Sequence, residues 1–478
     1  MRRCFLDAAL FLFLSAIYLL FAPGHLFTVD SVEVYRTAES LVRDHDLAIE
    51  RPYPLAGVDT KHFYSKYGVG QVIAVLPLYL VGEVVAGCSW GRSFFVRTYA
   101  EGFGGDPRIF FVSLFNVFVT AATALLVLRC CMRLGYRART GLWVAWIYGL
   151  ATLAFPHSRD FFQHPLTTWM LFFAFHALLV HRRSGGSGWL LLGGMALGYG
   201  MLTRPISVVA WPVHFALLAH AWRKEGGRGK RLREAAAFLL PLMGAFCVQL
   251  AYNHARYGSP FTFGYFSIDD RPGFSTPLYV GLYGYLFSPG RSIFLYSPPL
   301  IAALLAFPAF LRRCRVEGYA LLSIFLLFLG CYATWHVWDG GWCWGPRYLL
   351  QSLPFLLLPL AETIESGSRQ GRFFLALCVG AGVFVQVPGV LIDYNEIFWK
   401  WRQMALQPAD AYLFHPGISP IVEHWRAIVA GRPLDLWLLD RKAHLGALPF
   451  GVALGILLTV ALLALLLAWR ASRPDYRS

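Results

Sequence analysis

Long apolar runs recur along the whole chain and constrain its fold more than any other feature. The first run, Phe5–Phe21, approaches the length that an α-helix needs to cross a bilayer, and many comparable runs follow it. Hydrophobic residues make up 57% of the chain and charged residues 14%, which disfavours a soluble globular protein. Because no small-x-small cleavage site follows the first run, we interpret it as a retained helix. The sequence predicts an all-α polytopic membrane protein.

Short basic loops between the apolar runs indicate the topology. The formal net charge is +15, and because its basic residues gather in these loops it indicates membrane orientation and not nucleic-acid binding. All clusters share one side only if Val69–Gly87 does not cross the membrane, so we predict that this segment lies at the outer interface or against the bundle. The predicted cytoplasmic clusters are Arg129–Arg139, His181–Arg183, Arg223–Arg233, Arg312–Arg315, Arg369–Arg372 and Arg470–Arg473.

This choice predicts about twelve transmembrane helices with both termini inside and juxtamembrane helices in the first outer loop. The spans fall near 5–22, 109–128, 141–156, 164–181, 188–203, 205–222, 234–252, 293–311, 317–334, 347–361, 372–392 and 446–468. Residues 1–256 form a predicted catalytic membrane module with a large outer loop at 23–108. Residues 257–478 form a C-terminal membrane module, and the outer loops around it are 253–292, 335–347 and 393–444.

The first outer loop carries two acids and two lysines that suggest chemistry. Asp30 and Glu33 are three residues apart, so on a helix both carboxylates lie on one face, where one is a candidate general base. The alternative is that Asp30 caps a helix that starts at Ser31. Lys61 and Lys66 lie in a basic, aromatic stretch and are candidate phosphate ligands, although lysines beside a bilayer also snorkel to lipid headgroups.

The second outer segment, 156–165, holds four ionisable groups between two apolar runs. Asp160 and His164 are four residues apart and would share a helical face, where they would bind a metal, a sugar hydroxyl or each other. Arg159 is a further candidate ligand, and a structural ion pair between Arg159 and Asp160 is the alternative.

The third outer segment, 335–348, combines four tryptophans with His336, Asp339 and Arg347. Tryptophans alone would indicate an interfacial aromatic belt, but the acid and the paired glycines suit a sugar site, and Arg347 suits a phosphate clamp. Arg204 and Arg291 also lie near the outer ends of apolar runs. One such arginine is a common membrane anchor, but three on the same face favour an anionic ligand.

Together these segments resemble the C-type glycosyltransferases, a polytopic superfamily that includes protein O-mannosyltransferases and the lipid A aminoarabinose transferase. Over about the first 250 residues the resemblance is architectural: an acid soon after the first span, a non-crossing segment after Tyr64–Gly70 and a second acidic loop before the fourth span. Later motifs look like those of uncharacterised bacterial members: Tyr257-Gly258-Ser259-Pro260, Ser288-Pro289-Gly290-Arg291 with Tyr296-Ser297-Pro298, and Trp338-Asp339-Gly340-Gly341 with Gly345-Pro346-Arg347-Tyr348.

The resemblance implies transfer of a sugar from a polyprenyl-phosphate carrier to an envelope glycan, lipid or protein. Asp30 would deprotonate the acceptor hydroxyl while the sugar leaves its phosphate with inversion, and Arg347, Arg291 or Lys66 would stabilise that phosphate. Asp160 and His164 would orient the sugar or acceptor. Many members carry adjacent acids in loop one, whereas Ser31 follows Asp30 here, so a role for Glu33 and for a divalent metal both stay open.

Two other classes fit a polytopic chain. A secondary transporter or flippase of a lipid-linked or anionic substrate would place ionisable groups at mid-depth, whereas here they gather in outer loops. A non-catalytic lipid-binding or assembly protein is the third hypothesis. No cofactor is certain, and a divalent metal is possible. The nine cysteines contain no Cys-x-x-Cys pair, so no zinc site or disulfide framework is indicated. The high arginine content suits a bacterial inner membrane, with the active site outside the cytoplasm.

Overall fold

A computed structural model of the chain describes residues 2–49, 55–56, 62–95, 105–222, 227–266, 273–404, 410–440 and 447–472. It confirms the predicted all-α polytopic class. Six described helices are long and apolar enough to cross a membrane. They are α3 (Val69–Gly87), α5–α6 (Pro107–Ser113 and Phe115–Arg133), α11 (Arg228–Tyr257), α15 (Arg315–Ala333), α18 (Arg369–Leu391) and α23 (Ala447–Ser472).

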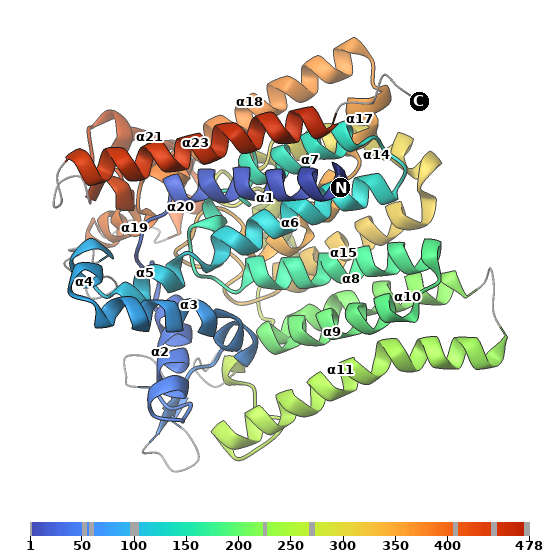
Figure 1. Ribbon diagram of the computed structural model, residues 1–478, viewed down its shortest axis with the longest axis horizontal. Coiled ribbons are helices and arrows are strands. Elements are labelled where there is room, and N and C mark those ends of the chain that lie inside the picture. Colours follow the sequence, from blue (N-terminus) through green and yellow to red (C-terminus); the bar gives the residue numbers. More distant parts are fainter. Residues whose placement is uncertain are drawn as a thin grey trace.

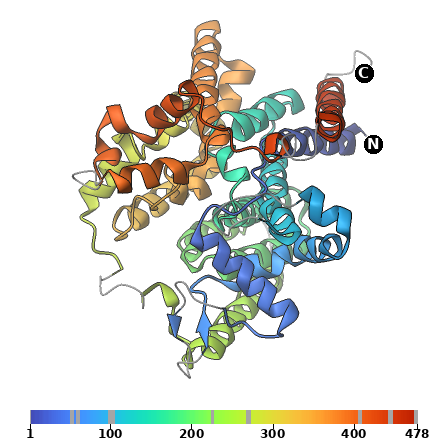
Figure 2. The same ribbon diagram turned by 90° about the vertical axis from the view of Figure 1, so that its left-hand side faces the viewer.

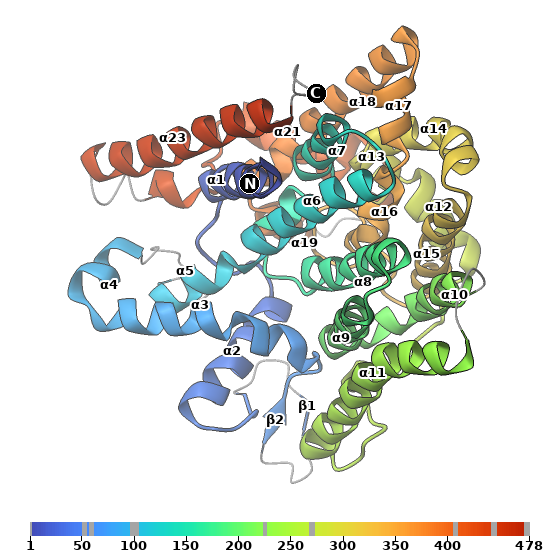
Figure 3. The same cartoon turned by 45° about the vertical axis from the view of Figure 1, so that its right-hand side comes forward.

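Apart from α3, these long helices lie in one bundle, from α18 and α23 at the top of Figure 1 to α11 at the bottom. Helix α1 (Arg2–Leu20) and α23 pack along each other, and Figure 3 shows the same pairing from another side. The start of α1 and the end of α23 lie at the same end of the bundle. The division into modules at residue 256 stays a prediction, and this helix pair joins the two.

Three of the predicted cytoplasmic clusters, 129–139, 181–183 and 312–315, make contacts at that end of the bundle. Arg313 lies 4.0 Å from Glu362 and from Glu365, the Tyr136 hydroxyl donates to Glu362 at 2.6 Å, and Arg182 pairs with Glu317. These three basic loops therefore share one end of the bundle, as the charge pattern predicted, and the side of the membrane on which they lie stays a prediction.

The first outer loop forms a separate layer at the opposite end. It contains α2 (Val29–Arg43), the antiparallel strands β1 (Leu55–Ala56) and β2 (Phe63–Tyr64), α3 and α4 (Ser89–Phe95). Figure 2 shows α2 in front of the bundle and the two strands near the end of α11. Helix α3 packs on α2, α4 and α5 and touches α9 (Ser187–Thr203), and its predicted course outside the membrane stays a prediction.

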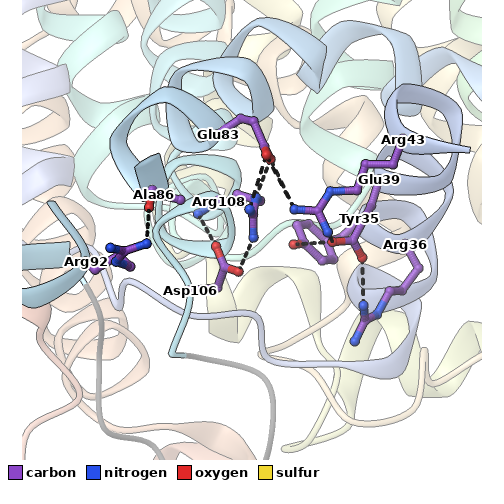
Figure 4. Close-up of polar contacts among 9 residues, drawn as sticks. All are labelled: Tyr35, Arg36, Glu39, Arg43, Glu83, Ala86, Arg92, Asp106 and Arg108. Atoms are coloured by element: carbon purple, nitrogen blue, oxygen red, sulfur yellow. Dashed lines mark hydrogen bonds and ion pairs between the residues drawn. The ribbon is translucent and has the colours of Figure 1, made fainter. Parts of the chain in front are cut away.

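An ion-pair network holds α2, α3 and the start of α5 together (Figure 4). Arg108 binds Glu83 of α3 and Asp106, and Arg43 of α2 lies 3.4 Å from Glu83. Most of these side chains are partly exposed, so each pair is worth less than about 1 kcal/mol. The network orients the loop-one helices more than it stabilises the fold.

At least four expected spans are not continuous α-helices among the described residues. The span expected at 205–222 divides into Pro205–Ala210 and Trp211–Ala221, and the one expected at 293–311 divides into Ile293–Tyr296 and Pro299–Arg313. The span expected at 141–156 ends at Leu150, and prolines 346, 354 and 359 divide the span expected at 347–361, because proline removes a backbone donor. The elements concerned are α7 (Ala138–Leu150), η1 (Pro156–Ser158), α8 (His164–Ser184), η4 (Arg347–Ser352), α16 (Leu353–Leu357) and α17 (Leu360–Ser366). The remaining elements are η2 (Pro205–Ala210), α10 (Trp211–Ala221), η3 (Gly264–Phe266), α12 (Leu278–Phe287), α13 (Ile293–Tyr296), α14 (Pro299–Arg313), α19 (Tyr394–Gln403), α20 (Ala411–Phe414), η5 (Pro416–Ile418) and α21 (Pro420–Val429).

Candidate functional site

A cavity of about 1890 Å³ lies at the loop-one end of the bundle. Its lining brings together the start of α2, the segment before α3, the end of α9 with η2, the start of η4, and helices α19 and α21. The predicted site residues that line it are Asp30, Lys66, Arg204, His336 and Arg347.

Asp30 lies in the first turn of α2 and is not its cap. The cap is Thr28, whose side chain accepts from the Ser31 backbone N–H at 3.3 Å, so the capping alternative for Asp30 is wrong. The Asp30 carboxylate is 33% exposed and lines the cavity. Both Nη atoms of Arg347 lie 3.3 Å from its Oδ2 atom. Asp30 is therefore accessible from the cavity while it is paired with a cation.

The surroundings of Asp30 keep it ionised. Burial alone would raise the pKa of its carboxyl group, but the charges of Arg347 and Lys66 and a hydrogen bond from Tyr67 outweigh it and hold the pKa below its ordinary value. Burial raises the pKa of the Tyr67 hydroxyl, so that group stays protonated and donates. A carboxylate in this state can accept a proton from a hydroxyl that enters the cavity.

Glu33 has a different environment from Asp30, one turn away. It is 4% exposed, does not line the cavity, and accepts from the Ser65 hydroxyl at 3.0 Å. Burial raises the pKa of its carboxyl group to about 7, although Lys66 and Ser65 oppose the shift. Asp30 and Glu33 thus have unequal affinities for a proton, and only Asp30 faces the cavity.

Arg204 and Arg347 bring unused hydrogen-bonding capacity to the cavity. Within the described ranges, the Nε atom of each is buried without a hydrogen-bond partner, as are both ring nitrogens of His164. The Tyr348 ring centroid lies 5.6 Å from the guanidinium of Arg204, 5.3 Å from that of Arg347 and 5.4 Å from the His164 ring. Unmet buried donors are costly, so this cluster favours a polar or anionic ligand.

Arg159 and Arg291 are not free to bind such a ligand. Arg159 pairs with Asp435 at 2.7 Å, and the same carboxylate lies 3.0 Å from His25. Arg291 donates to the backbone carbonyls of Asp339, Gly290 and Gly341, and it is fully buried. Neither arginine lines the cavity, and the structure gives both of them structural contacts.

The expectation that Asp160 and His164 share a helical face is wrong. Helix α8 begins only at His164, with Pro165 in its first turn, and residues 160–163 are not helical. Asp160 instead lies 2.5 Å from His157 Nδ1, whose other ring nitrogen lies 3.1 Å from the Trp344 carbonyl oxygen. The predicted pair between Arg159 and Asp160 is also wrong, since each has another partner.

The other predicted residues are spread around the cavity. His336 lines it, with Nδ1 lying 3.2 Å from the Gly273 carbonyl oxygen. Asp339 accepts from the Tyr412 hydroxyl at 3.3 Å and does not line it. Lys61 lies outside the described residues. No group of three His, Cys, Asp or Glu side chains among the described residues is arranged to hold a metal ion.

Sequence reasoning missed several residues of the site. Tyr67 and Tyr348 line the cavity directly beside Lys66 and Arg347, and each was part of a motif already singled out. Their adjacency to a cation is the signal that was available. His157 was also in the second outer segment, but its partner Trp344 is remote in sequence, so no local pattern indicated it.

The cavity has two chemically different walls. One is largely apolar and comes from α9, η2 and α11, with Met201, Ile206, Val208 and Phe246, and Gln249 of α11 is its polar member. The other comes from α19, α21 and the residues after α21, and its polar members are Asn395, Glu396, Lys400, Gln403, Glu423, Arg426 and Arg432. Asp30 and Arg347 belong to neither of these walls.

No protein-family model matches the sequence, and no curated protein matches it. Its fold, however, matches solved structures. ArnT from Cupriavidus metallidurans bound to undecaprenyl phosphate aligns with a TM-score of 0.51 at 14% identity, over 97% of this chain and 77% of ArnT. The apo oligosaccharyltransferase from Archaeoglobus fulgidus aligns with a TM-score of 0.52 at 12% identity, over 91% of this chain and 64% of that enzyme. This chain has the fold of the C-type glycosyltransferases. It spans less than two thirds of the length of the archaeal enzyme.

Proposed function

We propose that this protein is a membrane glycosyltransferase that moves a sugar from a polyprenyl-phosphate carrier to an acceptor hydroxyl outside the cytoplasm. The observation that carries the proposal is the ionised, cavity-facing Asp30 paired with Arg347, which retains an unmet donor. A base and an anion-binding group therefore lie side by side, as transfer from a phosphate ester to a hydroxyl requires. The fold shared with ArnT, which was crystallised with undecaprenyl phosphate, supports the choice of carrier.

The proposed reaction is a single displacement at the anomeric carbon. Asp30 takes the proton of the acceptor hydroxyl, the acceptor oxygen bonds to the anomeric carbon, and the bond between that carbon and the phosphate oxygen breaks. The phosphate leaves with an additional negative charge, which Arg347, Arg204 and Lys66 are placed to stabilise at the cavity surface. One displacement inverts the anomeric configuration. Arg347 would exchange part of its contact with Asp30 for contact with the phosphate.

The two walls of the cavity support a division of labour between substrates. A polyprenyl chain suits the apolar wall around Ile206 and Phe246, because burying apolar surface there is favourable. A hydrophilic acceptor suits the mixed-charge wall formed by α19 and α21. A typical pocket for one ligand has a volume of about 300–1,000 Å³. This cavity is larger, as a site for two substrates must be.

The decisive experiment uses purified protein in lipid nanodiscs with a panel of radiolabelled polyprenyl-phosphate sugars and an envelope extract as acceptor. Wild type should transfer sugar, and Asp30→Asn should lower the rate about 1,000-fold, since a positioned base contributes about 10²–10⁴-fold. Asp44→Asn is the matched control, because Asp44 caps the other end of α2 and is exposed.

Equal rates for wild type and Asp30→Asn would remove Asp30 from the reaction. If the protein in sealed proteoliposomes moved intact lipid-linked substrate across the bilayer and transferred no sugar, the transporter hypothesis would be favoured over the enzyme.

A further inference from the structure

Three buried polar residues follow one face of α11, the outermost helix at the lower edge of Figure 1. Gln249, Asn253 and Arg256 are spaced four and three residues apart, and each is at most 2% exposed. The Gln249 amide donates to Asn253 Oδ1 at 2.8 Å, and Arg256 Nη2 donates to the same oxygen at 3.1 Å. Polar groups on a helix that is otherwise apolar enough to span a membrane need a specific role.

Arg256 binds the segment that carries Lys66 and Tyr67. Its Nη1 atom donates to the Ser65 carbonyl oxygen at 2.5 Å and lies 3.3 Å from that of Tyr67. These two carbonyls flank Lys66 on either side. The guanidinium group is held against the rings of Tyr252 and Tyr257, with centroids at 3.6 and 4.6 Å.

Further hydrogen bonds hold the same segment in place. The Tyr257 hydroxyl donates to the Ser65 carbonyl oxygen at 3.0 Å and the Tyr252 hydroxyl to that of Tyr67 at 3.3 Å. From the α2 side, Glu33 accepts from the Ser65 hydroxyl, which itself accepts from the Tyr67 backbone N–H at 3.2 Å.

The segment is also packed tightly on the end of α9. A Cβ atom on Gly68 would overlap the Leu202 carbonyl oxygen, and one on Gly70 would overlap Thr203. Thr203 directly precedes Arg204, so this contact sets Lys66 relative to Arg204. The backbone around Lys66 is therefore held on three sides, by α11, α2 and α9. As a result, the Lys66 side chain reaches the cavity from a nearly fixed position.

We propose that Arg256 is a positioning residue that fixes the Ser65–Tyr67 backbone, so that Lys66 meets the carrier phosphate and Tyr67 donates to Asp30. The inference rests on the function proposed above. Arg256 does not line the cavity, so it acts through the segment and not by touching substrate. Loss of its contacts would let Lys66 move, and a displacement of about 1 Å can cost about 100-fold in rate.

The first test does not depend on function. Hydrogen–deuterium exchange of the full-length protein in nanodiscs should show the amides of residues 65–67 exchanging at least about tenfold faster in Arg256→Gln than in wild type. Arg233→Gln is the matched control, because Arg233 is an exposed arginine on the same helix. Unchanged exchange in a folded Arg256→Gln protein would overturn the proposal.

The second test asks whether Arg256 acts through Lys66, with undecaprenyl phosphate as the probe and native mass spectrometry as the readout. Arg256→Gln should weaken binding about tenfold in the wild-type background and by less than about twofold in the Lys66→Ala background. An equal loss in both backgrounds would assign Arg256 a structural role only. Arg256→Lys, which keeps the charge and a donor, should restore part of the affinity and serves if Arg256→Gln does not fold.

The two failures can be told apart. If wild type binds no undecaprenyl phosphate and transfers no sugar, but exchange at residues 65–67 still rises in Arg256→Gln, the proposed function fails and the positioning by Arg256 stands. If wild type is active and the exchange and binding of Arg256→Gln match those of wild type, the positioning proposal alone fails.

Discussion

Arg204 and Arg347 differ from Arg159 and Arg291 in what their guanidinium groups bind, although all four are at most 9% exposed. The first two line the cavity and each keeps a buried Nε atom without a partner among the described residues. The last two spend their donors on a carboxylate or on backbone carbonyls. Burial therefore does not separate the two pairs of arginines, whereas their position does: only Arg204 and Arg347 line the cavity.

The largest effect is expected on stability, when Arg291, one of the two arginines with structural contacts, is replaced. Arg291→Ala removes a fully buried cation and leaves three carbonyl oxygens, which are buried or partly buried, without their donor, so the free energy of unfolding should fall by about 4 kcal/mol. Denaturant titration of the detergent-solubilised protein measures this. Arg402→Ala, on an exposed part of α19, should change it by less than about 0.5 kcal/mol. A stable Arg291→Ala protein with weakened carrier binding would place Arg291 with the binding arginines.

The second largest effect is expected from Glu33, whose carboxyl group should make the stability of the fold depend on pH. Because its pKa is raised to about 7, the folded protein holds this proton more tightly than the unfolded chain, whose carboxyl has a pKa near 4.5. The free energy of unfolding should therefore fall as the pH rises from about 4.5 to about 7, by about 3 kcal/mol in total. Above pH 7, Glu33 should contribute little further change. Glu33→Gln should flatten that part of the curve of unfolding midpoint against pH. An unchanged slope in Glu33→Gln would contradict the raised pKa.

On the binding side, Arg347→Ala should weaken undecaprenyl phosphate binding about 100-fold, or about 2.7 kcal/mol, because it removes the cation beside the leaving phosphate. Its unfolding midpoint should change much less than that of Arg291→Ala, since Arg347 has an unmet donor and a partner that is a third exposed. Titration of the nanodisc-embedded protein with undecaprenyl phosphate measures this affinity. If Arg347→Ala lost stability and kept its affinity for undecaprenyl phosphate, Arg347 would have a structural role like that of Arg291.

Arg204→Gln should give a smaller loss of undecaprenyl phosphate affinity, about tenfold, because Tyr348, beside Arg204, also faces Arg347 and the phosphate keeps two other cations. The transfer rate should fall by a similar factor. A loss larger than that of Arg347→Ala would make Arg204 the main phosphate ligand.

The smallest effect is expected at the exposed network of Figure 4. Glu83→Gln should lower the free energy of unfolding by less than about 1 kcal/mol and leave carrier affinity unchanged, because its arginine partners are partly exposed. A large loss of carrier affinity would show that the orientation of α2 and α3 depends on this network.

Sequence patterns predicted the polytopic class and the sharing of one end by the basic loops, because hydropathy and charge are local properties. They also assigned Asp30, Lys66, Arg204 and Arg347 to one face, since each lies near the end of an apolar run, and all four line the same cavity. They failed where a partner is remote in sequence. Arg159 and Asp435 are 276 positions apart. No residue near Arg159 in the sequence indicated that a carboxylate elsewhere in the chain would pair with it.

They also failed where proline decided the backbone. Pro165 in the first turn of α8 starts that helix at His164, so the spacing of Asp160 and His164 did not translate into a shared face. The same residue type divided the segment after Arg347 into short helices.

The pairing of Asp30 with Arg347 has a consequence for biosynthesis. The two residues are 317 positions apart, so at about 5–20 residues per second the ribosome needs about 15–60 s to make Arg347 after Asp30. During that time the acid has no arginine partner and the chain has no assembled site. Under the function proposed above, a growing chain would stay inactive toward lipid-linked sugars in the membrane around it until most of its length has been inserted.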